Sequence, residues 1–156
     1  MPHLRALLGD AYEVHDFDER GVPNNADHQW RIDETKYWLD LSRQKVSKGK
    51  VLVVCGFSNP DEIAELQEGY IVDEARTILL DGDVEIIEQR LRSRNTDPLI
   101  LKDLERAVGS PDAFIENNTR FVPILREICR KRNCPIIDTT HLVPEDVAKE
   151  VAKFVK

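Results

Sequence analysis

Apolar and polar residues mostly alternate along the chain, and five consecutive apolar residues, Val51 to Cys55, interrupt this alternation. The run is too short for an ordinary helix and predicts a strand that is covered on both faces. Such a strand belongs in the middle of a parallel sheet with helices on each side. Gly56 and Phe57 begin the polar turn that follows, at the position where open α/β sheets bind ligands.

Other segments show helical or strand periodicity in a regular order. Strands are predicted at residues 12–17, 75–81 and 134–138, in addition to the Val51 strand. Helices are predicted at residues 2–8, 27–46 with Asp27 as the N-cap, 60–67, 83–94, 100–108, 111–131 and from 144 onward. A strand followed by a helix, repeated four times, predicts an α/β fold: a three-layer α/β/α arrangement with a mostly parallel sheet. The length suits one domain, residues 1–156.

Composition narrows the classes of partner. The net charge of −7 argues against nucleic acid as the main partner, because a protein needs a basic surface to bind its phosphates. A local arginine cluster could still bind a phosphorylated small molecule. The three cysteines are odd in number and scattered, which is typical of free thiols in a reducing cytoplasm. The first residues lack the apolar core of a signal peptide, and no run approaches the roughly 18 apolar residues of a membrane helix. We therefore expect a cytoplasmic protein without a membrane partner.

Acidic residues follow the first predicted strand. Asp16, Asp18 and Glu19 lie at its carboxyl end, where ligand sites cluster in open sheets. They would otherwise be solvated loop charges. Arg31, next to Trp30, offers a planar guanidinium for an acidic or phosphorylated acceptor, or else Trp30 lies in the core and Arg31 at the surface.

Three arginines form the strongest basic cluster. Arg90, Arg92 and Arg94 lie near the end of a predicted helix, and Arg90 and Arg94 share a face at a spacing of four. They could bind a phosphorylated small molecule, or they could simply be favourable at a helix C-terminus. His15 and His141 are isolated, so no residue is assigned to a metal.

Several motifs together resemble one family. They are Val14–Pro23 (VHDFDERGVP), Trp30-Arg31, Trp38-Leu39, Val54-Cys55-Gly56 with Pro60-Asp61-Glu62, Leu79-Leu80-Asp81 with Glu88–Arg94 (EQRLRSR), and Pro135–Thr140 (PIIDTT). In these motifs the chain resembles P-loop kinases of the nucleoside, nucleotide and shikimate kinase type. The resemblance implies ATP and Mg²⁺ as cofactors and a small nucleoside- or phosphate-containing substrate.

The resemblance also implies roles for single residues. Asp16, Asp18, Arg90 and Arg94 would be catalytic, the arginines as part of a lid. Glu19, Trp30, Arg31, Gly56 and Phe57 would contact the substrate. Arg92, Asp138 and Thr139 would contact the nucleotide.

One defining part of that family is missing from the sequence. No G-x-x-x-x-G-K-[ST] loop occurs, and the single Gly-Lys pair, Gly49-Lys50, precedes a strand instead of following one. The family places the strand before that loop between the Val51 strand and the Arg76 strand. We therefore expect little or no kinase activity, and an unpaired sheet edge that favours a homo-oligomer.

Two other functions remain open. The first is a non-catalytic module that binds a ligand or a partner on a degenerate kinase fold. The second is a phosphatase of the haloacid dehalogenase type, because Asp16-Phe17-Asp18 resembles its D-x-D motif. Arg20 stands where that motif continues with Thr or Val, and Asp81-Gly82-Asp83 makes a poor metal pair.

Overall fold

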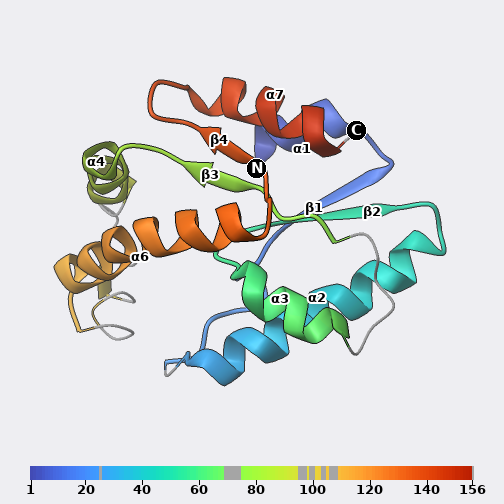
Figure 1. Ribbon diagram of the computed structural model, residues 1–156, viewed down its shortest axis with the longest axis horizontal. Coiled ribbons are helices and arrows are strands. Elements are labelled where there is room, and N and C mark those ends of the chain that lie inside the picture. The colour runs from blue at the N-terminus through green and yellow to red at the C-terminus, as the bar shows by residue number, and fades with distance from the viewer. Residues whose placement is uncertain are drawn as a thin grey trace. The chain divides into compact units, whose positions relative to one another are not determined.

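The computed structural model describes residues 1–24, 26–68, 75–94, 98, 101–102, 105 and 109–155. It is a mixed α/β structure in which every strand pair is parallel (Figure 1). The chain divides into two compact units, one formed by Met1–Val22, Ala26–Arg76 and Leu142–Lys156, the other by Pro23–Asn25 and Thr77–His141.

The first unit contains two strands and four helices. These are α1 (Pro2–Leu8), β1 (Tyr12–Asp16), α2 (His28–Val46), β2 (Val51–Cys55), α3 (Pro60–Glu68) and α7 (Pro144–Val155). The two strands are in parallel register from Tyr12 opposite Val51 to Asp16 opposite Cys55. Their carboxyl ends therefore lie at the same edge.

Helices pack on both faces of this strand pair because its side chains alternate. Val14 points to one face, where it forms a core with Leu4 and Leu8 of α1 and with Ala148 and Ala152 of α7. His15, the next residue, stacks on the Trp38 ring of α2, with ring centroids 5.1 Å apart. Helix α2 therefore lies on the opposite face of the sheet from α1 and α7.

In the ranges that the structure describes, the second unit contains a shorter strand pair and two long helices. These are β3 (Leu79–Asp81), α4 (Val84–Arg94), α6 (Pro111–Lys131) and β4 (Ile136–Asp138). β3 and β4 are parallel, with Leu79 opposite Ile136 and Asp81 opposite Asp138. An ion pair of 2.6 Å between Arg126 Nε and Asp81 Oδ2 joins α6 to the end of β3.

Most predicted helices are confirmed, and the strands are shorter than predicted. Residues 75–78 are not in a strand, and residue 17 follows β1 instead of belonging to it. Asp27 caps α2 by accepting a hydrogen bond of 2.9 Å from the Trp30 amide. The predicted helix at 100–108 lies largely outside the described residues.

Helices lie on both faces of β2, as predicted: Val53 and Cys55 pack against the core formed with α1 and α7, and α2 contacts the strand from the other side. The cover is incomplete, since Val51 is 44% exposed and the rest of the strand is partly exposed. In the described part of the chain β2 pairs with β1, and a position in the middle of a larger sheet stays a prediction.

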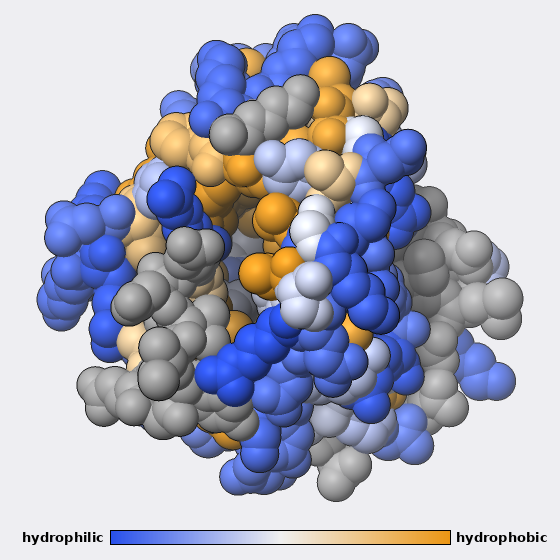
Figure 2. Space-filling model, turned by 90° about the vertical axis from the view of Figure 1, so that its right-hand side faces the viewer, coloured by the Kyte–Doolittle hydropathy of each residue, from blue (hydrophilic) through white to orange (hydrophobic). Residues whose placement is uncertain are grey.

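Hydrophilic residues make up much of the face seen in Figure 2, as expected for a chain in which 33% of residues are charged. Apolar side chains appear between them in smaller groups. No helix in the described ranges is long and apolar enough to cross a bilayer.

Candidate functional site

The carboxyl end of β1 continues into a tight acidic turn. The Asp18 amide donates a hydrogen bond of 3.0 Å to Asp16 Oδ1, and the Glu19 amide donates one of 3.1 Å to the Asp16 carbonyl. The Gly21 amide donates to the Asp18 carbonyl at 2.9 Å. An aspartate that accepts a hydrogen bond from the residue two positions on stabilises such a turn locally. The turn holds Asp16 and Asp18 in fixed positions at the strand end.

The end of β2 lies directly against this turn. The Phe17 amide donates a hydrogen bond of 2.8 Å to the Cys55 carbonyl, which extends the ladder by one residue. Gly56 follows with φ of 153°, and a Cβ placed on it would be 2.6 Å from Phe17 Cβ. Only glycine permits this close approach. Gly56 and Phe57, both predicted to contact substrate, therefore lie beside the acidic turn.

Aromatic residues of α2 support the turn from one side. Trp38 is 5% exposed, and its indole Nε1 donates a hydrogen bond of 3.2 Å to the Phe17 carbonyl. Trp30 meets the Phe17 ring edge-on, with centroids 6.0 Å apart. Trp30 is only partly buried. The indole ring of Trp30 therefore packs against Phe17 and is still partly exposed beside the turn.

Arg31 is held by an acidic residue of α3. Its Nη2 donates a hydrogen bond of 3.2 Å to Glu62 Oε1, and His28 Nδ1 lies 3.0 Å from the same oxygen. The Arg31 guanidinium also lies 5.9 Å from the centroid of the Phe57 ring. The Glu62 carboxylate balances the charge of Arg31 and orients it, so an acidic ligand would share Arg31 with Glu62.

The turn concentrates negative charge. Partial burial raises the pKa of the Asp18 carboxyl, and the carboxylates of Asp16 and Glu34 raise this pKa further. Glu34 Oε2 accepts a hydrogen bond of 3.1 Å from Arg20 Nη1, while Glu34 Oε1 is buried without a partner among the described residues. The charge directly around the Asp18 carboxyl favours a hydroxyl or a cation at that point of the site.

We expect Asp18→Asn to stabilise the protein at pH 7. A raised pKa means that the folded state disfavours the charged carboxylate, so the destabilisation by Asp18 grows as the pH rises above its unfolded pKa and is complete above its folded pKa. Below the unfolded pKa, near 3.8, both states bind the proton and the difference should disappear. Urea denaturation followed by circular dichroism at pH 7 and pH 3 measures this.

The matched control is Asp10→Asn, at an exposed turn before β1. It should change the free energy of unfolding by no more than about 0.5 kcal/mol, the range of ordinary surface substitutions. An equal gain for both variants, or a gain for Asp18→Asn that persists at pH 3, would contradict the electrostatic explanation.

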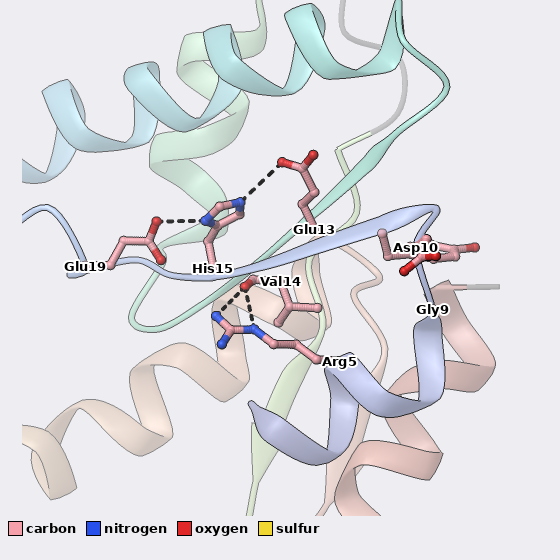
Figure 3. Close-up of a pocket in the computed structure, with 8 residues that line it drawn as sticks. Arg5, Gly9, Asp10, Glu13, Val14, His15 and Glu19 are labelled. Atoms are coloured by element: carbon pink, nitrogen blue, oxygen red, sulfur yellow. Dashed lines mark hydrogen bonds and ion pairs between the residues drawn. The ribbon is translucent and has the colours of Figure 1, made fainter.

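Sequence reasoning missed a histidine with two acidic neighbours (Figure 3). His15 Nδ1 lies 2.7 Å from Glu19 Oε1, and His15 Nε2 lies 3.7 Å from Glu13 Oε2. The hydrogen bond with His15 lowers the pKa of Glu19, and Glu19 Oε2 also accepts a hydrogen bond of 3.2 Å from the Asp16 amide. Glu19, predicted to bind substrate, therefore orders the turn. Glu19 follows His15 by four positions, and this spacing in the sequence could have indicated the pair.

These residues border an open hollow of about 620 Å³. Its lining includes Arg5, Asp10, Glu13, His15 and Glu19. Arg5 points inward to the strand, since its Nε and Nη2 donate hydrogen bonds of 3.0 and 2.7 Å to the Val14 carbonyl (Figure 3). Most polar groups drawn there already bind one another, so the hollow is a weaker ligand site than the strand-end turn.

The remaining predicted residues lie in the second unit. Arg90 donates hydrogen bonds to Thr139 Oγ1 at 3.0 Å, to the Thr139 carbonyl at 2.7 Å and to the Thr140 carbonyl at 3.2 Å. Arg92 pairs with Glu88 and Asp112, each at 2.8 Å. Arg94 is exposed in the last turn of α4. In this structure Arg90 holds the loop after β4, and Arg92 joins α4 to the start of α6.

The loop after β4 is also ordered by its own side chains. Asp138 Oδ1 accepts hydrogen bonds from the Thr140 amide at 2.9 Å and from Thr140 Oγ1 at 2.6 Å, and these lower the pKa of Asp138. Thr139 Oγ1 donates to the Asp81 carbonyl at 2.7 Å. The residues predicted to contact a nucleotide thus form a well-connected strand end.

The predicted site residues therefore form two groups. The first unit brings together Asp16, Asp18, Glu19, Trp30, Arg31, Gly56 and Phe57. The second unit contains Arg90, Arg92, Arg94, Asp138 and Thr139, of which Arg90 contacts Thr139. In the described part of the chain, no group of three or more His, Cys, Asp and Glu residues is placed to hold a metal ion.

No protein-family model, curated protein or solved structure matches this chain.

Proposed function

We propose that this chain is a kinase-like phosphotransferase domain, related to small-molecule kinases, that lacks the phosphate-binding loop and has little or no activity by itself. The observation that carries the proposal is the acidic turn at the carboxyl end of β1, beside Gly56 and Phe57 at the end of β2. Ligand sites of open α/β sheets lie at such strand ends.

The strand pairing supports the proposed ancestry. The resemblance places an absent strand between the Val51 strand and the Arg76 strand. The structure pairs β2 with β1 and β3 with β4, each in parallel. This pairing is what a P-loop-kinase-like sheet would retain without that strand, and the three-layer α/β/α arrangement is part of the proposal.

The acceptor would bind at the strand-end turn. Asp16 and Asp18 would accept hydrogen bonds from a hydroxyl of the acceptor and hold it for transfer, with Asp18 as the better base because its pKa is raised. Trp30 and Phe57 offer apolar surface for a ring, and Arg31 offers a cation for an acidic group of a nucleoside- or phosphate-containing ligand.

The described residues do not fit ATP with Mg²⁺. The sequence contains no glycine-rich lysine loop to hold the phosphates. The carboxylates of Asp16, Asp18 and Glu34 are close enough to interact electrostatically, but among the described residues no three acidic, histidine or cysteine side chains are placed to hold a metal ion together. Without a bound metal ion, these carboxylates would repel a triphosphate chain. We therefore expect acceptor binding without turnover.

Two titrations test the proposal. Nucleosides, nucleoside monophosphates and shikimate should be screened by tryptophan fluorescence, because Trp30 lies beside the site. We expect at least one of them to change the emission, and Asp16→Asn to weaken its binding about tenfold, the effect of about 1.4 kcal/mol. Calorimetry with Mg-ATP should show no tight binding, and a coupled assay should show no turnover.

Asp10→Asn serves as the control, since Asp10 lies at the other end of β1. It should bind the same ligand with unchanged affinity. The absence of any response across the screen would contradict the acceptor site. Tight Mg-ATP binding with turnover would contradict the proposed loss of activity.

A non-catalytic assembly module is the second candidate. The single-sided pairing of β2 favours it. The phosphatase alternative has less support, since Asp81 is engaged by Arg126 in the second unit, and activity on an aryl phosphate would be its test. A cytoplasmic location is part of the proposal.

A further inference from the structure

We infer that the outer edge of β2 is a dimerisation surface on which two copies of this chain pair their β2 strands in antiparallel orientation. This inference is independent of the proposed function, because it rests on the strand pair of the first unit alone.

The backbone of β2 directs alternate residues to its two edges. The Val51 amide donates to the Ala11 carbonyl at 3.0 Å, and the Cys55 carbonyl accepts from the Phe17 amide at 2.8 Å, so these residues face β1. Leu52 and Val54 must then direct their amides and carbonyls to the outer edge. Within the part of the chain that the structure describes, no hydrogen bond joins those groups to another segment.

Several outward-facing backbone groups of β1, in contrast, are already hydrogen-bonded. Arg5 donates two hydrogen bonds to the Val14 carbonyl, and Glu19 accepts one from the Asp16 amide (Figure 3). The Tyr12 amide donates to the Gly9 carbonyl at 3.2 Å. Side chains and a turn thus block this edge against an added strand, as proteins commonly do with exposed sheet edges.

Among the residues that the structure describes, the outer edge of β2 has none of these protections. Val51 to Cys55 contains no charge and no proline, and its residues have high strand propensity. Val51 and Phe57, on either side of Leu52 and Val54, are each more than 40% exposed. On a chain with a net charge of −7, this uncharged strand is a segment where two copies can approach without repulsion.

Charge and register both favour a second copy as the occupant. A twofold axis at Val53 pairs Leu52 of one copy with Val54 of the other, so that all four outward-facing residues exchange hydrogen bonds. In this arrangement, Lys48 and Lys50 at the amino end of one β2 lie toward Asp16 and the acidic turn of the other copy. Opposite charges therefore meet at both ends of the paired strands.

The oligomeric state tests the inference first. We expect the wild-type chain to have twice the monomer mass by size-exclusion chromatography with light scattering at about 100 μM. Val54→Pro removes an amide at the outer edge and leaves the ladder with β1 intact, so the dimer dissociation constant should rise at least tenfold. A monomeric wild-type chain, or an unchanged dissociation constant for a folded Val54→Pro variant, would overturn the inference.

Cross-linking tests the register and does not depend on the proline variant. The axis at Val53 places Val51 opposite Cys55 of the second copy, in a pair whose Cα atoms are about 4.5 Å apart, within the range of a disulfide. Under oxidising conditions Val51→Cys should form a covalent dimer through Cys55, identified by peptide mass spectrometry and lost when Cys55 is replaced by serine.

Val46→Cys, at the exposed end of α2, is the control and should not form this cross-link. A Val51→Cys chain that remains a monomer, or that joins through Cys129 or Cys134, would contradict the proposed pairing.

Discussion

Replacing Trp38 with alanine is expected to lower the free energy of unfolding by about 3–5 kcal/mol, the range found for large aromatic residues in cores. Trp38 is 5% exposed, and its rings contact those of His15 and Tyr37, each with centroids 5.1 Å away. Its loss would also remove the hydrogen bond of 3.2 Å to the Phe17 carbonyl. Because that carbonyl begins the acidic turn, the substitution should loosen the candidate site as well as the core.

Urea denaturation followed by circular dichroism measures this effect without relying on tryptophan emission. Tyr37→Ala is the matched control, since Tyr37 is the preceding residue of the same helix and is 38% exposed. Its cost should be below about 1.5 kcal/mol, because less apolar area returns to water. A similar loss for both variants would show that Trp38 does not anchor the two strand ends.

Gly56→Ala is expected to destabilise the protein by about 2–4 kcal/mol, the combined range of an overpacked contact and a strained backbone. The added Cβ would lie 2.6 Å from Phe17 Cβ, and the φ of 153° is rarely adopted by residues with a side chain. To avoid the overlap, the end of β2 must move away from β1. The proposed acceptor site should therefore lose affinity together with stability.

Gly49→Ala separates the cost of the steric contact from the cost of the positive φ. Gly49 also has a positive φ, of 70°, but a Cβ there meets nothing within 4 Å. It should cost only about 1 kcal/mol, the penalty of a left-handed conformation for a residue with a Cβ. Chemical denaturation of both variants, with circular dichroism as the readout, makes the comparison. Equal losses would show that contact with Phe17 is unimportant.

Local signals predicted the helices well because each signal acts within one turn of the chain. Asp27 was expected as an N-cap, and it caps α2. The proline at the start of α6 was likewise a reliable beginning, and Ser110 before it accepts a hydrogen bond of 3.0 Å from the Ala113 amide. Neither assignment needs information from distant residues.

The candidate site was predicted only in part. The positions of Asp16, Asp18, Gly56 and Phe57 at strand ends followed from the strand prediction, and the parallel pairing places them together. The close approach of Gly56 to the Phe17 side chain depends on how the strands pack. That contact could not be derived from a glycine after a hydrophobic run.

Charged partners were the least predictable feature. Arg31 pairs with Glu62, which is distant in sequence, and Arg90 binds the loop after β4 in the same way. An arginine in the sequence needs either an acidic partner or water, but the sequence does not show which of several acidic residues will pair with it. The choice depends on which acid the fold brings within hydrogen-bonding distance.

The sequence alone determined where helices begin, where apolar runs form strands and which residues follow those strands, because these properties depend on neighbours a few positions away. The tertiary structure decided that β2 pairs with β1, that Glu19 orders the turn, and that Arg90 holds a loop. Each of these is a choice among distant partners of similar chemistry, and only the packing of the chain makes one of them closest.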